Sequence, residues 1–133
     1  MRIFFDTNVL ISAYYFDGNE REVLSKIIDS EHTPVISMQV IEETKSVMNN
    51  KFGEKRENIR DFVERLLADT KLVGDHTIDI DVEDESDKNI IGSAVKAECS
   101  YLLSGDEAVQ NCGSELEDIK IINAGEFLET DWE

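Results

Sequence analysis

The stretch that decides the fold opens the chain. Residues 2–12 read RIFFDTNVLIS, and the short stretch RIFF at residues 2–5 leads directly into Asp6. We expect this stretch to form a short strand. Asp6 follows it at once, in a position to cap a helix or to stand at the carboxyl end of the strand. The chain therefore begins with a strand whose end carries an acid.

Working outward from this opening, strand-like and helix-like segments alternate along the sequence. The expected strands are residues 2–5, 33–37, 71–73, 77–80, 101–103 and 120–122, and the expected helices are residues 20–28, 38–48, 55–67, 87–97 and 126–128. Such alternation is typical of an α/β protein. We expect a single domain over residues 1–133, built as a three-layer α/β/α sandwich with a short, mainly parallel central sheet. The tail at residues 129–133 is expected to fray.

Composition excludes several classes of protein. The chain has 133 residues, a hydrophobic share of 41% and a net charge of −17, which suits one folded domain rather than a disordered chain. No run approaches the roughly 20 apolar residues of a membrane span, so we expect a cytoplasmic protein without membrane contact. Cys99 and Cys112 have no closely spaced partner and predict neither a disulfide framework nor a zinc site; Cys99 is expected to be a small buried apolar residue.

Acidic residues recur where the predicted strands end. Asp6 follows the first strand directly, Glu43 lies in the helix after the second, and Asp106 follows residues 101–103 across a Ser-Gly turn. Asp84 and Asp87 stand three apart at the start of the helix of residues 87–97, so both side chains can face one side of a first turn. Parallel strands gather ligand sites at their carboxyl ends. Carboxylates collected there suit a hard divalent cation, Mg²⁺ or Mn²⁺.

Each acid also has a structural explanation when taken alone. Asp6, Asp84 and Asp87 are suitable helix caps that complement the helix dipole. Glu43 fits a solvated helix face, and Asp106 fits a turn. Only the combination, in this order on an α/β frame, favours a metal site.

The order of these motifs resembles that of the PIN-domain nucleases, including VapC-type toxins. The resemblance rests on FFDTNVLIS at residues 4–12, VISMQVIEET at 35–44, the segment at 84–109 and IKIINAGEFL at 119–128. It implies that Asp6, Glu43, Asp87 and Asp106 are the catalytic, metal-binding acids, and that Asp84 matches a further acidic metal position. Asn8 and Ser104 match residues that orient the carboxylates; Ser104 stands where threonine is more usual.

The resemblance implies a function and partners as well. A protein of this family would be a Mg²⁺- or Mn²⁺-dependent ribonuclease that hydrolyses RNA phosphodiesters with activated water, and it would be the toxin of a toxin–antitoxin pair. A basic antitoxin and a homodimer follow by analogy. Three alternatives stay open: a PIN-like module that binds RNA or protein without cutting, a receiver-type phosphotransfer domain with an aspartate nucleophile, and a plain interaction module.

The strong negative charge conflicts with RNA binding, which favours a basic surface. Residues 45–65 are the exception, because six cations there face four acids for a local net charge of +2, which leaves −19 on the rest of the chain. We expect this segment to contact phosphates, with Lys45 and Lys51 nearest the site as substrate-binding residues. An ordinary salt-bridged helix surface would give the same pattern.

Overall fold

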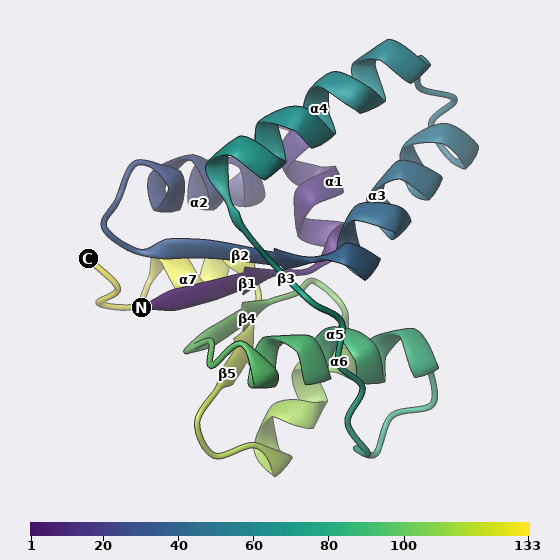
Figure 1. Ribbon diagram of the computed structural model, residues 1–133. Coiled ribbons are helices and arrows are strands. Elements are labelled where there is room, and N and C mark those ends of the chain that lie inside the picture. The colour runs from purple at the N-terminus through teal and green to yellow at the C-terminus, as the bar shows by residue number, and fades with distance from the viewer.

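Five short parallel strands form the centre of the molecule, in a computed structural model that describes all residues 1–133 (Figure 1). The strands are β1 (Arg2–Phe5), β2 (Thr33–Ser37), β3 (Lys71–Val73), β4 (Tyr101–Leu103) and β5 (Lys120–Ile122), in the sheet order β3-β2-β1-β4-β5. All four pairings are parallel. The α/β fold class is therefore confirmed, and the sheet is wholly rather than mainly parallel.

Helices cover both faces of this sheet, as expected for parallel strands joined by right-handed crossovers. The helices are α1 (Thr7–Tyr15), α2 (Asn19–Ile28), α3 (Met38–Asn50), α4 (Arg56–Asp69), α5 (Glu85–Lys96), α6 (Glu107–Asn111) and α7 (Ala124–Leu128), with a 3₁₀ turn at Cys112–Glu115. In Figure 1, α1 to α4 lie above the sheet and α5 and α6 below it. The short helix α6 was not expected from the sequence.

The central strand β1 is the most deeply buried element. Ile3, Phe4 and Phe5 are fully buried, and β1 pairs with β2 on one side and β4 on the other. A strand covered on both faces reads as a continuous apolar run rather than an alternating one. This placement brings Asp6, the next residue, to the middle of the sheet's carboxyl edge.

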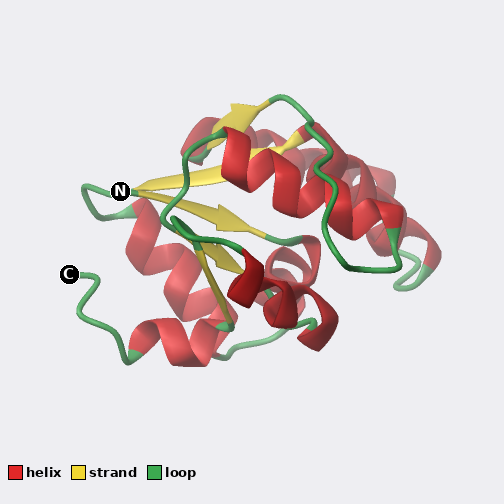
Figure 2. Ribbon diagram, turned by 90° about the horizontal axis from the view of Figure 1, so that it is seen from below, coloured by secondary structure: helices red, strands yellow, loops and turns green.

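The prediction of a strand at residues 77–80 is wrong. This stretch lies in the long connection between β3 and α5, one of the loops drawn green in Figure 2. It runs against α5, where Ser93 Oγ lies 2.9 Å from the backbone N of His76 and Ile78 N donates to Lys88 O (3.4 Å). A Cβ on Gly92 would stand 2.2 Å from His76 O, so the bare glycine is what lets the segment come this close. Ile78 packs against α5 at Gly92, and Ile80 is buried in the core.

The end of the chain is also more ordered than expected. Trp132 is only 8% exposed and stacks on Phe127, with ring centroids 5.6 Å apart. Its carbonyl oxygen lies 2.7 Å from His32 Nε2. Fraying of residues 129–133 is therefore wrong, because a large buried aromatic ring holds the tail on the core.

Both cysteines are free and buried, in agreement with the expectation for Cys99. Burial raises the pKa of the Cys99 thiol to about 12. None of the helices has the length and hydropathy of a membrane span.

Candidate functional site

Asp6 lies at the carboxyl end of β1 and caps α1, so the two readings of this residue hold at once. Its side chain is 6% exposed. Oδ1 accepts from the backbone N of Thr7 (2.7 Å), and Oδ2 accepts from Ser104 Oγ (2.7 Å) and Asn8 Nδ2 (3.2 Å). A carboxylate held by three donors keeps one orientation, which a pre-formed site requires.

Asn8 and Ser104 also connect Asp6 to Asp106. Asn8 Oδ1 accepts from the backbone N of Gly105 (2.8 Å), and Ser104 Oγ accepts from the backbone N of Asp106 (3.1 Å). Asp106 caps α6 by accepting from Ala108 N at Oδ1 (2.9 Å), while its Oδ2 has no protein donor. The turn after β4 is thus tied to the start of α1.

Glu43, in the first half of α3, is held by two residues that sequence reasoning missed. Its Oε1 accepts from Gln39 Nε2 (2.9 Å) and from Ser86 Oγ (2.9 Å), and Gln39 Nε2 lies 2.8 Å from Ser86 Oγ. Gln39 precedes Glu43 by four residues, one helical turn, which was the available signal. Ser86 lies on α5 and could not be connected to Glu43 without the fold.

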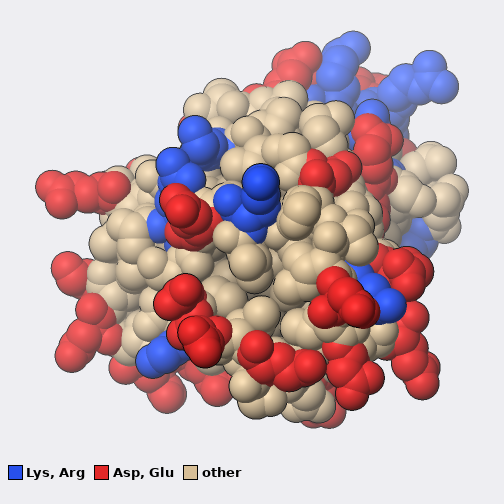
Figure 3. Space-filling model, turned by 60° about the horizontal axis from the view of Figure 1, so that its bottom comes forward, with Lys and Arg blue, Asp and Glu red and all other residues tan.

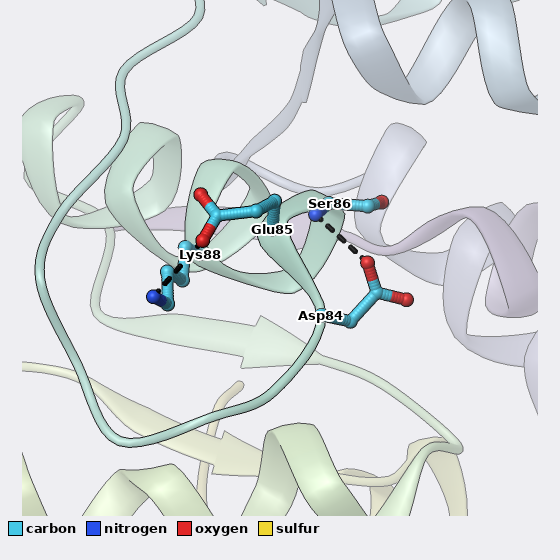
Figure 4. Close-up of polar contacts among 4 residues, drawn as sticks. All are labelled: Asp84, Glu85, Ser86 and Lys88. Atoms are coloured by element: carbon cyan, nitrogen blue, oxygen red, sulfur yellow. Dashed lines mark hydrogen bonds and ion pairs between the residues drawn. The ribbon is translucent and has the colours of Figure 1, made fainter.

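Asp84 and Asp87 stand at the start of α5. Asp84 is its N-cap, accepting from Ser86 N at Oδ1 (2.9 Å). Figure 4 shows the Asp84 carboxylate and the Ser86 side chain pointing to one side, while Glu85 and Lys88 form an ion pair on the other. The Asp87 carboxylate accepts no side-chain or backbone hydrogen bond, so it keeps both oxygens free.

Asp6 and Asp87 have raised pKa values, and the charges of neighbouring acids contribute to both. Burial raises the pKa of Asp6, and the negative charges of Glu43 and Asp106 add to that increase. Burial raises the pKa of Asp87 to about 6, with further contributions from Asp106, Asp84, Asp6 and Glu43. These contributions indicate that the carboxylates of five acids lie around a common region, which we call the acidic mouth: Asp6, Glu43, Asp84, Asp87 and Asp106.

No cation of the chain compensates this charge. The four ion pairs of the molecule involve other acids. No three acidic, thiol or imidazole groups lie close enough to hold an ion as they stand. The carboxylates of the acidic mouth are therefore neighbours, but they do not converge on a single coordination sphere.

The two predicted phosphate contacts lie in different places. Lys45 stands two residues beyond Glu43, and its Nζ lies 3.6 Å from Glu42 Oε1. Lys51 is the C-cap of α3, about 12 Å along the helix from Glu43 at 1.5 Å per residue. Lys51 therefore does not stand at the acidic mouth. In the view of Figure 3, acidic side chains lie along the lower edge of the molecule and basic side chains lie mainly in its upper part.

Three solved structures share this arrangement of elements. A chain of the VapBC2 complex of Rickettsia felis bound to promoter DNA matches with a TM-score of 0.67 and 13% identity, over 92% of this chain and 98% of that one. VapC20 of Mycobacterium tuberculosis, a sarcin–ricin loop cleaving toxin, matches with 0.61 and 13%, over 89% and 98%. The PIN domain endonuclease Utp24 matches with 0.56 and 15%, over 90% and 82%. At these identities the likeness establishes the fold.

Family membership comes from the sequence itself. No curated protein matches the chain, but the sequence model of the PIN domain matches residues 2–108. That region holds all five acids together with Asn8, Ser104 and the two residues that hold Glu43. The match spans most of the chain, and the chain therefore belongs to the PIN domain family.

Proposed function

We propose that this protein is a metal-dependent ribonuclease that hydrolyses RNA phosphodiesters endonucleolytically. The observation that carries the proposal is the acidic mouth: five acids from four separate segments of the chain lie near one another at the carboxyl edge of a parallel sheet, and none of them forms an ion pair. The nuclease names of two similar folds, one of them a toxin that cleaves the sarcin–ricin loop, support the same reading.

The donor set fits a hard divalent cation. Asp6, Glu43, Asp87 and Asp106 would hold it, with Asp84 beside them, and Mg²⁺ or Mn²⁺ prefers such oxygen ligands. Free oxygens remain on Glu43 (Oε2), Asp106 (Oδ2) and Asp87. Burial, with a smaller contribution from the neighbouring acids, raises the pKa values of Asp6 and Asp87, and a bound cation would relieve the repulsion among these groups.

The chain's own residues prepare this site. Ser104, Asn8 and the Thr7 amide hold Asp6 in one orientation, and Gln39 and Ser86 fix one oxygen of Glu43. Burial keeps bulk water away from Asp6. A bound divalent ion would lower the pKa of an attacking water and stabilise charge on the phosphate.

A cleavage assay with two matched variants tests this proposal. We expect Mn²⁺- or Mg²⁺-dependent cutting of a labelled single-stranded RNA, reduced about 100-fold or more in Asp6→Asn because an essential ligand loses its charge. Glu85→Gln is the control, since it also removes one negative charge, but from a side chain at the start of α5 that points away from Asp84 and Ser86 (Figure 4). Equal activity in Asp6→Asn and the wild type would refute the assignment.

The main alternative is a PIN-like module that binds RNA or protein without cutting. The presence of all four acids, each with its side chain free or held at the mouth, favours the enzyme. The same assay separates the two, because a non-catalytic module would bind the RNA and leave it intact in Mn²⁺ and Mg²⁺.

We further propose that the protein is the toxin of a toxin–antitoxin pair. The similar fold in a VapBC2 complex supports this, and a net charge of −17 favours a basic protein partner by electrostatic attraction. A homodimer is proposed by the same analogy. Expression of the wild type should arrest growth and Asp6→Asn should not; sedimentation would give the oligomeric state.

A further inference from the structure

Two helices that begin near the acidic mouth end together at a cluster of aromatic rings, which consists of Tyr14, Tyr15, Phe52 and Phe62. α1 starts directly after Asp6 and ends at Tyr15, and α3 carries Glu43 near its start and ends just before Phe52. The two helices pack against each other, both above the sheet in Figure 1. At 1.5 Å per residue, the cluster lies about 13 Å along either helix from the acids. A few nucleotides of an extended strand span that distance.

Phe52 is the exposed member of this cluster. Its ring stacks on Tyr15 with centroids 4.0 Å apart and planes 11° apart, yet the residue is 37% exposed. Tyr15 covers one face of the ring, and the exposed fraction shows that solvent reaches part of the remaining side chain. Tyr15 is itself fixed, since its hydroxyl donates to Glu54 Oε2 (2.9 Å) and its side chain packs on a small core of Ile11, Met48 and Ile59.

The loop around Phe52 is the cationic exception in an acidic protein. Residues 51–56 read KFGEKR, with three cations against one acid. Lys51, Lys55 and Arg56 are exposed, and none forms an ion pair. The single acid, Glu54, is turned toward Tyr15 and Asn58 by hydrogen bonds. Gly53 allows the turn with a positive φ of 58°.

We propose that Phe52 is a stacking platform for one unpaired base of a single-stranded RNA, whose backbone is held by Lys51, Lys55 and Arg56. An aromatic face among cations is how proteins hold single strands without reading their sequence. A protein ligand is the less favoured occupant, because the exposed aromatic surface is one ring surrounded by unpaired charge. The inference rests on the proposed function, for which it supplies the substrate class: RNA with at least one unstacked base a few nucleotides from the cut.

Binding is measured by fluorescence anisotropy of the full chain in EDTA, where no cleavage occurs. The probes are a labelled 12-nucleotide oligoadenylate and an abasic oligomer of the same length. We expect Phe52→Leu to weaken oligoadenylate binding roughly 5- to 100-fold, Phe52→Trp to retain it, and both to bind the abasic oligomer like the wild type. Phe16→Leu is the matched control, because Phe16 is an exposed aromatic, 59% accessible, with no cation beside it in the sequence.

Three results would overturn the platform: no oligoadenylate binding by the wild type, equal binding by Phe52→Leu, or equal loss of both oligomers in Phe52→Leu. Thermal unfolding checks that Phe52→Leu is folded. If it is not, quenching of the new indole in Phe52→Trp by oligoadenylate, absent with the abasic oligomer, decides the matter. RNA binding that depends on Phe52 without cleavage in Mn²⁺ would refute the proposed nuclease activity but support the stacking platform. Cleavage that is unchanged by substitution of Phe52 would support the nuclease activity but refute the platform.

Discussion

Gly92 in α5 offers a test in which the sign of the effect, and not only its size, depends on the tertiary structure. Alanine inside a helix is more favourable than glycine by about 1 kcal/mol, because glycine loses more backbone entropy. If α5 packed loosely at this point, Gly92→Ala would therefore stabilise the protein. The structure predicts the opposite.

The added methyl group would meet backbone atoms that cannot easily move. An ideal Cβ at Gly92 stands 2.2 Å from His76 O and 2.8 Å from Ile78 N, whereas ordinary carbon contacts are about 3.5–4.0 Å. The segment is held in place by the contact of Ser93 Oγ with His76 N and by Ile78 N bonding to Lys88 O. Overpacking of this kind costs about 3 kcal/mol at the upper end of its range. After the gain in helix propensity, we expect a net loss of about 2 kcal/mol.

Urea unfolding followed by circular dichroism measures this loss, and thermal unfolding should show a fall of roughly 8 °C. Gly125→Ala in α7 is the control. Its Cβ would meet Asn19 Nδ2 at 2.9 Å, the far end of a flexible side chain, so its stability should stay within about 1 kcal/mol of the wild type. A Gly92→Ala variant as stable as the wild type, or more so, would refute the close packing of residues 76–78 on α5.

Three further predictions concern the site and the tail. The pKa of Asp87 is about 6 in the fold against an ordinary 3.8, so the metal-free protein gains stability as the pH falls from 7 through 6. At pH 7.5 the Asp87→Asn variant should be more stable than the wild type by roughly 1 kcal/mol, a value reduced because Asp87 is partly exposed. A difference in unfolding temperature between the two proteins that does not shrink below pH 5 would contradict this. Ser86→Ala should weaken Mn²⁺ binding, measured by electron paramagnetic resonance, about 10-fold through the loss of a donor to Glu43, and Ser86→Thr should restore it; unchanged affinity would show that Ser86 does not position the acid. Trp132→Ala should cost about 3 kcal/mol in urea unfolding, because it removes a buried ring from Phe127, and a loss below about 1 kcal/mol would mean that the tail is frayed after all.

Much of the fold was readable because local pattern and tertiary position agree. The stretch RIFF before Asp6 predicted a short strand, and the helical spacing of apolar residues predicted α2 to α5 within a few residues. Residues 77–80 show where this reasoning ends. Alternation of apolar and polar residues reports that one side of an extended segment is buried, but it does not report whether a strand or a helix covers that side.

Some residues of the candidate site could be predicted from the sequence, and others could not. Strand-end position was enough to select Asp6 and Asp106, since parallel strands deliver their ends to one edge. Ser86 was beyond its reach, because its contact with Glu43 joins α3 to α5 across 43 residues of sequence, whereas Gln39 stands only one turn before Glu43 in the same helix.

The sequence by itself determined most of the order of strands and helices, the strand that leads into Asp6 and the set of candidate acids, because each depends on the chemistry of neighbouring residues. Only the tertiary structure decided which donors hold those acids, that residues 77–80 lie on α5, and that Phe52 stands on Tyr15 among free cations. These are contacts between side chains far apart in the chain, and only the packing of whole elements determines their distances.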